Sequence, residues 1–462
     1  QQVLDGTRYS GFEIPTADGW VVEGESDPYK CVVPLDVYPQ SLNPEQGYVF
    51  TANNDPGNIS TDDSLTNDPW YIGGSWIEGY RADRIDTLLS QAIAENRADI
   101  EEMQIIQGDI KSALGAAFSP VLVESIELAQ GLSATDGPLT DTEARIVDLY
   151  LQDSDRMDEA LEYLKSWEEA DYPALSGVET FYHTPGENEA TMSVATTLHN
   201  AWMGRFQAMV FNDEGMPDVW EPTGATGITR ALTLMVEGRG DDNPNELAAW
   251  NEETGESIFF DIKDTAQVEV SQEIALMAML DAFLWLESES EERERGGYGS
   301  PDMENWIWGL KHVVRFDSIL ASFLGDDFAF LTEPFSITTD LLPIAPNLER
   351  DDPRNELVGF PRHGDTLAVD AANNGFSTDN FDYGSGPVFR MVVALGESSV
   401  EVVNIIPGGQ SGLAGDPHFA DQAELWLGNQ ALTIPFSPEE VAAEGLSREV
   451  FRPVQADLSC GR

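Results

Sequence analysis

Two asparagines and an arginine are the side chains whose types and spacing in this sequence are best suited to chemistry. Asn53 and Asn54 follow residues 48–51, a run of aromatic and β-branched residues that is typical of a strand. A side-chain amide at a strand end can direct its N–H at a developing oxyanion, and Arg81 is spaced to orient or neutralise the same site. Asparagine also tolerates the left-handed backbone of turns, so a purely structural turn at 53–57 is the competing interpretation.

The element that carries Arg81 is expected to be a helix, because helical periodicity runs from Tyr80 to about residue 330. Apolar residues recur at helical spacing in three stretches: Ile85, Leu88, Leu89 and Ile93; Ile100, Met103, Ile106 and Ile110; Leu149, Leu151, Met157, Leu161 and Leu164. A further apolar helix is expected at 272–286. The mixed charge run at 287–297 that follows it is typical of a solvated loop.

Strand patterns lie on both sides of this helical region. Towards the C-terminus they cover 366–370, 389–393 and 400–406, and glycine turns separate them. Strands, a long helical region and strands again indicate an α+β fold with a split sheet. The expected division is a β-rich segment at 1–78, a mainly helical region at 79–330 and a C-terminal β-rich segment at 331–462.

Other residues that invite a catalytic interpretation have simpler structural ones. His199 lies in the helical stretch 193–202, where a histidine of the core or surface is favoured over a ligand. Ser411 stands in Gly-Gln-Ser-Gly, which lacks the Gly-x-Ser-x-Gly spacing of a nucleophile elbow. No lysine follows these glycines as a phosphate loop requires, so a structural turn is predicted here.

The charge balance is extreme, with 83 acidic and 24 basic residues and a formal net charge of −59 among 462 residues. Nucleic acid and anionic membrane surfaces are therefore disfavoured partners. The hydrophobic content of 41% supports a substantial core, and no run of about 18 apolar residues predicts a membrane span. Because the acids are scattered, a saline habitat is the favoured explanation, and recruitment of cationic substrates is the alternative.

Cysteines and loop carboxylates offer few clues to a metal site. Cys31 and Cys460 are too few for a thiolate cluster, and they pair only if the tail folds back in an oxidising compartment. Residues 55–68 carry oxygen ligands suited to calcium, without the spacing of an EF-hand. A solvated acidic loop is the competing interpretation.

Several motifs along nearly the whole chain carry a resemblance to one known family. They are Asn43-Pro44-Glu45-Gln46-Gly47-Tyr48, Thr51-Ala52-Asn53-Asn54-Asp55-Pro56, Gly79-Tyr80-Arg81-Ala82-Asp83-Arg84-Ile85, Trp308-Gly309-Leu310-Lys311-His312, and Pro407-Gly408-Gly409-Gln410-Ser411-Gly412 followed by Asp416-Pro417-His418-Phe419-Ala420-Asp421-Gln422. Together they resemble the penicillin acylases, which are N-terminal-nucleophile amidohydrolases. The resemblance implies a four-layer αββα sandwich with a large helical insertion.

The resemblance also implies roles for particular residues. The asparagine matching Asn53 supplies an oxyanion-hole amide in that family, and the arginine matching Arg81 lies beside the catalytic centre. The family's nucleophile is a serine whose own amino group is the base, which argues against His312 as a general base. Some members bind a structural calcium partly through an aspartate that Asp68 matches, and no organic cofactor is expected.

The implied function is hydrolysis of linear amide bonds of small acylated substrates through an acyl-enzyme. Because this sequence starts with Gln1-Gln2, the serine is expected on the remaining part of a processed precursor, which would be the partner of this chain. The chain alone is then expected to be inactive, and the assembled enzyme to be periplasmic or secreted. A non-catalytic scaffold or binding chain of the same fold is the alternative.

Overall fold

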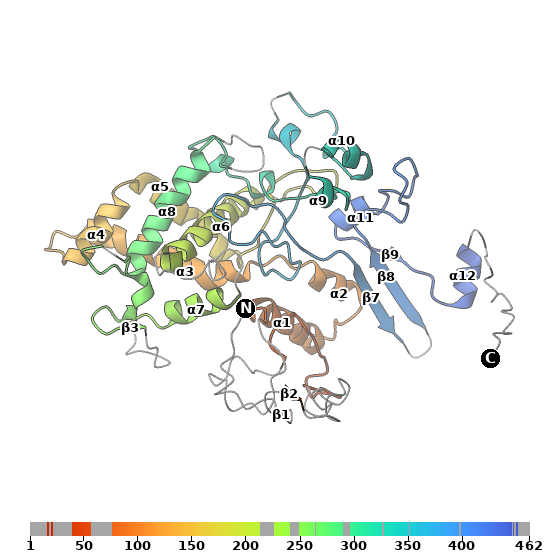
Figure 1. Cartoon of the computed structure of the whole chain (residues 1–462), viewed down its shortest axis with the longest axis horizontal. Helices are drawn as coiled ribbons and strands as arrows, with labels where there is room; N and C mark the ends of the chain where they lie inside the picture. Colours follow the sequence, from red (N-terminus) through yellow and green to blue (C-terminus); the bar gives the residue numbers. More distant parts are fainter. Residues whose placement is uncertain are drawn as a thin grey trace.

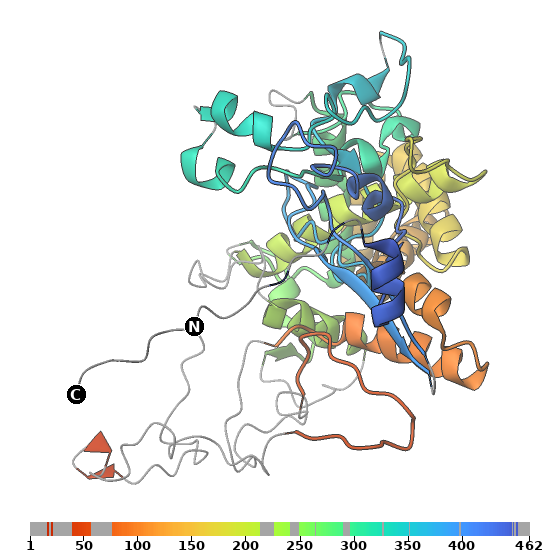
Figure 2. The same ribbon diagram turned by 90° about the vertical axis from the view of Figure 1, so that its right-hand side faces the viewer.

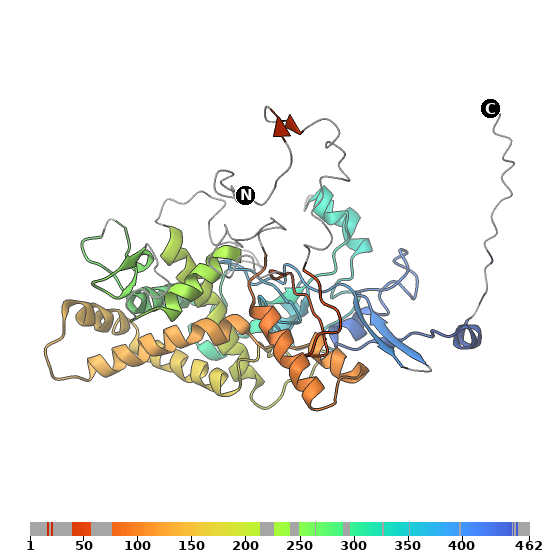
Figure 3. The same ribbon diagram turned by 90° about the horizontal axis from the view of Figure 1, so that it is seen from below.

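The structure is a computed structural model that describes residues 16–17, 20–21, 39–56, 76–212, 226–240, 249–263, 265–289, 296–325, 328–350, 352–396, 399–445, 447 and 450. Helices and small antiparallel sheets make up the described chain, which confirms the α+β class. Figures 1 and 3 show helices α3–α8 gathered at one end of the molecule and the largest sheet at the other. The domain division predicted from the sequence stays a prediction.

The helices lie mainly between residues 80 and 287, where the apolar periodicity predicts them. They are α1 (Tyr80–Ala94), α2 (Ile100–Gln107), α3 (Ala113–Ser133), α4 (Asp141–Tyr150), α5 (Ser154–Glu169), α6 (Glu189–Phe211), α7 (Thr226–Glu237), α8 (Ser271–Glu287), α9 (Ala321–Leu324), α10 (Ala329–Thr332), α11 (Ala423–Leu427) and α12 (Pro438–Glu444). The third predicted stretch is two helices, because a turn at 151–153 separates α4 from α5. Figure 2 shows the short helices α9 and α10 at one side of the molecule.

The strands are short, and each pairs antiparallel with its neighbour. They are β1 (Thr16–Ala17), β2 (Trp20–Val21), β3 (Trp250–Asn251), β4 (Glu256–Ser257), β5 (Val313–Val314), β6 (Phe360–Pro361), β7 (Arg390–Leu395), β8 (Val400–Ile405) and β9 (Leu432–Thr433). The largest sheet has the order β7-β8-β9. Strands β7 and β8 confirm the patterns at 389–393 and 400–406.

Two predicted strands are absent from the described chain. Residues 366–370 form turns, with Leu367 at φ 70°. The side-chain oxygens of Asn374 and Asn373 accept the N–H groups of Thr366 and Leu367, and such local bonds compete with a strand ladder. Residues 48–51 form no strand. A strand needs backbone hydrogen bonds to a neighbouring strand, and no strand of the described residues pairs with this segment.

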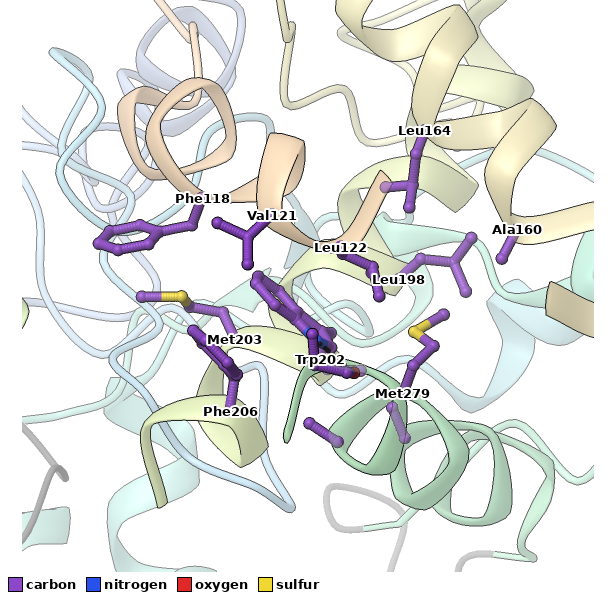
Figure 4. Packing of buried hydrophobic residues seen from close by; sticks show 14 of the residues in the cluster. Phe118, Val121, Leu122, Ala160, Leu164, Leu198, Trp202, Met203, Phe206 and Met279 are labelled. Atoms are coloured by element: carbon purple, nitrogen blue, oxygen red, sulfur yellow. Dashed lines mark hydrogen bonds between the residues drawn. The ribbon is translucent and has the colours of Figure 1, made fainter. Parts of the chain in front are cut away.

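The main core surrounds α6, which is buried on nearly every side between α3, α5 and α8. Figure 4 shows Trp202 of α6 among side chains of α3, α5 and α8. Its indole N–H donates to the Ala275 carbonyl of α8 at 3.0 Å, so the ring is both packed and hydrogen-bonded. This bundle is the scaffold onto which α1 is packed.

A buried ionic cluster lies between the bundle and the three-stranded sheet. Asp370 is fully buried and binds the guanidinium groups of Arg362 at 2.5 Å and Arg390 at 2.9 Å. Both guanidinium groups also lie over the ring of Trp426, at 4.9 and 4.5 Å from its centre. One buried carboxylate therefore holds two buried cations in place.

This cluster is linked to the helix that carries Arg81. Arg84, one turn along α1, binds Asp109 through its Nε and Nη2 atoms at 3.0 and 2.7 Å. The backbone carbonyl of Asp109 in turn accepts the N–H of Asp370. The start of α1 is thus fixed to the same framework as the sheet.

None of the helices in the described parts is long and apolar enough to cross a membrane. The formal net charge of −59 makes like-charge repulsion on the folded chain sensitive to salt. We expect the melting temperature to rise as sodium chloride is added, because the Debye length falls from about 30 Å at 0.01 M to about 3 Å at 1 M. Potassium chloride should give the same rise, since screening depends on ionic strength. A flat or falling melting temperature would contradict this expectation.

Candidate active site

The structure brings Asn53 and Arg81 into direct contact. The Nη2 atom of Arg81 donates to the Oδ1 atom of Asn53 at 2.5 Å and to the Ala52 carbonyl at 2.8 Å. Ala52 is buried, whereas Asn53 is exposed and has a left-handed backbone at φ 62°. The turn chemistry and the arginine contact are therefore combined at one residue.

The arginine contact fixes which way the Asn53 amide faces. A guanidinium group has only donors, so the amide oxygen must point to Arg81 and the NH₂ group must point away from it. Within the described residues, no acceptor is bonded to that NH₂ group. The amide therefore presents its donors outward, which is the orientation that an oxyanion requires.

The backbone around the amide is held by the segment that leads into α1. The N–H of Ile77 donates to the Asn53 carbonyl at 2.9 Å, and the side-chain oxygen of Asn54 accepts the Ala52 N–H at 3.2 Å. Asn54 is thus a turn residue, as the structural-turn interpretation of residues 53–57 predicts for it. Tyr80, the first residue of α1, bonds through its hydroxyl to Thr233 of α7. Contacts from two helices therefore position the site.

Glu78, in the segment that leads into α1, is a partly buried carboxyl that sequence reasoning did not single out. Burial raises the pKa of its carboxyl to about 7, and its Oε1 atom has no hydrogen-bond partner in the described chain. Burial also lowers the pKa of Arg81, whose Nε atom likewise lacks a described partner. The sequence offers one clue to Glu78: it is a single carboxylate between apolar Ile77 and the start of the helix, three residues before Arg81.

Comparison with known proteins identifies the family. The family model for penicillin amidase matches residues 11–443. This chain belongs to the penicillin amidase family. It is 23% identical over 445 residues to the acyl-homoserine lactone acylase QuiP of Pseudomonas aeruginosa, and this alignment covers 94% of the chain but 42% of that relative. The chain thus spans less than half the length of the curated relative it matches.

The other histidines singled out from the sequence lie in packed interiors. His312 is fully buried, donates from Nδ1 to the Phe381 carbonyl at 2.7 Å, and has its pKa lowered to about 4 by burial. His199 is packed between Trp167 and Trp202, and burial lowers its pKa to about 3. Both are core residues of this penicillin amidase relative, as expected for His199, and neither lies at the Asn53 turn.

The segment around Ser411 is a turn that holds α11. The Gln422 N–H donates to the Gly408 carbonyl at 2.7 Å, and the Ser411 N–H donates to the His418 carbonyl at 3.0 Å. A Cβ atom at Gly409 would lie 2.0 Å from that same His418 carbonyl, so only glycine fits. This geometry supports the structural-turn interpretation of the motif.

Asp68, the residue with a predicted metal role, lies outside the described residues. Cys31 and Cys460, whose pairing the sequence leaves open, lie outside them as well. Within the described chain, His183, Glu189 and His363 place potential ligand atoms within 4.8 Å of one another. The Nε2 atom of His183 is already 2.8 and 2.9 Å from the two carboxylate oxygens of Glu189. These oxygens also accept the N–H groups of Gly177 and Gly186.

The hydrogen bond made by His363 decides against a metal there. Its Nδ1 atom accepts the N–H of Ser176 at 2.9 Å, so the proton of the neutral ring lies on Nε2. A metal-bound histidine instead donates through its second ring nitrogen. We conclude that this cluster fastens the loop before α6 to the start of that helix.

A second buried carboxyl that the sequence did not reveal is Asp365. It accepts from the Ser112 hydroxyl at 2.5 Å and from the Asn200 amide at 3.3 Å, and its Oδ1 atom has no described partner. Burial raises its pKa to about 6. The fold therefore stabilises the neutral carboxyl relative to its state in water, and the group ionises as the pH rises through about 6.

This raised pKa gives a pH dependence with a definite sign. The folded state binds the Asp365 proton more tightly than the unfolded chain, so its contribution to stability is lost as the pH rises from about 4 to about 6. The difference corresponds to about 3 kcal/mol. Asp365→Asn should flatten this part of the stability–pH curve in denaturant unfolding, whereas exposed Glu101→Gln should leave it unchanged. Parallel curves for Asp365→Asn and the natural protein would contradict the assignment.

Proposed function

We propose that this chain is the part of a penicillin amidase-like amidohydrolase that supplies the oxyanion amide, Asn53, and the arginine that orients it, Arg81. The observation that carries the proposal is the contact from Arg81 Nη2 to the amide oxygen, which leaves the Asn53 NH₂ group free to donate. Membership of the family supports the reaction class, hydrolysis of an amide bond.

The reaction proceeds through a covalent acyl-enzyme. An N-terminal serine on the remaining part of the precursor attacks the amide carbonyl, and its own amino group accepts the hydroxyl proton. The carbonyl oxygen becomes an oxyanion, to which Asn53 donates a hydrogen bond that strengthens as the charge develops. Collapse of the intermediate breaks the C–N bond, and the departing amine takes the proton from the ammonium group of the serine. Water then hydrolyses the acyl-enzyme, which releases the acid and restores the free serine.

The substrate class is a small acylated amine. The relative from Pseudomonas aeruginosa is named an acyl-homoserine lactone acylase, which supports an amide-linked acyl group as the element that is recognised. We further propose that the assembled enzyme is periplasmic or secreted. A structural calcium held partly by Asp68 remains a proposal that isothermal titration with calcium can test.

Hydrolysis by the assembled protein is the direct test of this function. The gene product that includes this chain and the rest of the precursor should release chromophore from a phenylacetyl or long-chain acyl anilide. The isolated 462-residue chain should release none, because the proposed nucleophile lies on the other part. Turnover by the isolated chain would show that its own residues supply the nucleophile and would contradict the proposal.

Arg81→Ala should lower kcat by about 10- to 100-fold, because the amide of Asn53 loses the donor that fixes its orientation. Arg81→Lys should retain part of the rate, since an ammonium group offers a donor without the planar fork. Arg97→Ala, at an exposed ion pair, is the matched control and should stay near the natural rate. Unchanged steady-state kinetics in Arg81→Ala would remove the arginine from the site.

A further inference from the structure

We propose that a halide ion, chloride in a saline medium, binds beside Arg390 and Asn429, in a small cavity at the edge of the buried cluster of Arg362, Asp370 and Arg390. The ion is a structural counter-charge for this cluster. Its site shares no lining residue with the Asn53 turn and is independent of the proposed amidase function.

The buried ionic cluster holds one positive charge in excess. Arg362, Arg390 and Asp370 are 1%, 8% and 0% exposed, and the single carboxylate binds both guanidinium groups. Burial raises the pKa of the neighbouring Tyr383 to about 12 and lowers the pKa of His312 to about 4, so both are neutral near neutral pH. Because a buried charge without a counter-charge is costly, the cluster favours a further negative charge.

The same cluster has unmatched hydrogen-bond donors. The Nε–H groups of Arg362 and Arg390 and the indole N–H of Trp426 are buried, and they have no partner in the described chain. The Nη atoms of the two arginines are already bonded to Asp370, to Asn429 and to backbone carbonyls. Since buried donors are normally paired, the groups left unmatched here add to the positive potential of the cluster.

Asn429 turns two further donors away from the arginines. Its Oδ1 atom accepts from Arg362 Nη2 at 3.2 Å and from Arg390 Nη1 at 2.9 Å. A guanidinium group has only donors, so the amide oxygen must face the arginines and the NH₂ group must face away. Within the described residues, no acceptor is bonded to that NH₂ group. A Cβ atom at Gly108 would lie 2.9 Å from Asn429 Nδ2, which places these donors beside the end of α2.

A small cavity lies at this place. The end of α2, strands β7 and β8 and residues 429–431 form it, and Gly108, Arg390 and Asn429 are part of its wall. Figure 1 shows α2 beside β7, and Gln107 Nε2 donates to the Met391 carbonyl at 3.1 Å across this junction. The volume is about 10 Å³, close to what one water-sized particle needs. A single-atom anion suits this space, whereas phosphate or sulfate would displace the walls.

The cavity wall carries no carboxylate within the described chain. Besides Arg390 and Asn429, its polar side chains are those of Gln104, Gln107 and Gln430, and the other lining residues are apolar or glycine. In a chain with 83 acidic residues, a wall of uncharged amides beside an arginine favours an anion over a cation. A water molecule would satisfy the donors, but it would leave the excess charge in place.

Anomalous diffraction from crystals of the assembled protein soaked in sodium bromide tests the site directly. Bromide substitutes for chloride and is identified at its absorption edge. We expect an anomalous peak in the cavity, in contact with the Asn429 amide. The peak should be absent in Asn429→Asp, because the carboxylate supplies the missing charge. A natural protein without a peak at this position would overturn the proposal.

Asn429→Asp also tests the excess charge. Asn429 has φ 54°, a conformation that aspartate tolerates as asparagine does, and the carboxylate would accept from the same two arginines. Asn347→Asp is the matched control, at an exposed residue with φ 58°. In sodium gluconate, whose anion is too large for the cavity, Asn429→Asp should melt at the higher temperature. An equal or lower melting temperature would show that the cluster needs no further negative charge and would contradict the proposal.

Chloride dependence separates a built site from a chance ion. At constant sodium concentration and ionic strength, replacing gluconate by chloride should raise the melting temperature of the natural protein and of Asn347→Asp. This rise should exceed the change in Asn429→Asp by about 1 °C or more. General salt effects act on all three proteins alike and cancel in the comparison. A bromide peak without this difference would mean an adventitious ion only and would overturn the proposal, whereas the proposed amidase function would be unaffected.

Discussion

Replacing Asn53 by alanine or glycine should lower kcat of the assembled enzyme by about 10²- to 10³-fold, because the oxyanion loses a side-chain donor. Asn53 has φ 62°, so alanine there adds backbone strain whereas glycine adopts this conformation freely. Equal losses in the two variants would therefore assign the effect to the missing amide. Steady-state kinetics with an acyl anilide, beside a circular dichroism spectrum, measure both rate and fold.

Asn54→Ala is the matched control, since Asn54 is the neighbouring amide and its oxygen is bonded to the Ala52 N–H. It should change the rate far less than Asn53→Gly. A well-folded Asn53→Gly enzyme with full activity would mean that this amide is only a turn residue.

Asp370→Asn should destabilise the fold by about 3–5 kcal/mol, because it leaves the buried guanidinium groups of Arg362 and Arg390 without a counter-charge. The new side chain has nearly the same volume, so the loss is electrostatic and creates no cavity. Denaturant unfolding of the assembled protein measures it.

Glu127→Gln is the control for this substitution. It breaks the ion pair with Lys165, in which both side chains are 46% exposed, and it should cost no more than about 1 kcal/mol. If the two variants were equally stable, the Asp370 cluster would contribute no more than a surface pair.

Local patterns in the sequence predicted the parts of the fold that depend on local physics. The helices α1 and α8 and the hairpin β7–β8 follow from apolar periodicity and from glycine turns. The strand predicted at 366–370 was wrong, because Asn373 and Asn374 bind the backbone of Thr366 and Leu367 from several residues away. No periodicity reports such side-chain competition for backbone groups.

In the candidate site, too, the sequence predicted residues that local motifs identify and missed residues whose properties depend on distant parts of the chain. Asn53 and Arg81 were identified from residue type and resemblance, and the structure places them in contact. Glu78, Asp365 and Asp370 were missed, because their character comes from burial by elements distant in the sequence. Glu78 has only its place between Ile77 and the helix start as a signal, and for Asp365 and Asp370 the sequence of an acidic chain carries none that distinguishes them from the other carboxylates.

The central claim is that Arg81 acts on catalysis by orienting the Asn53 amide. A double-mutant cycle of Asn53→Gly and Arg81→Ala, read out as kcat of the assembled enzyme, tests it most directly. We predict that the double variant is about as slow as Asn53→Gly alone, because without the amide the arginine has nothing to orient. A rate loss equal to the product of the two single losses would show that the residues act independently and would contradict this account.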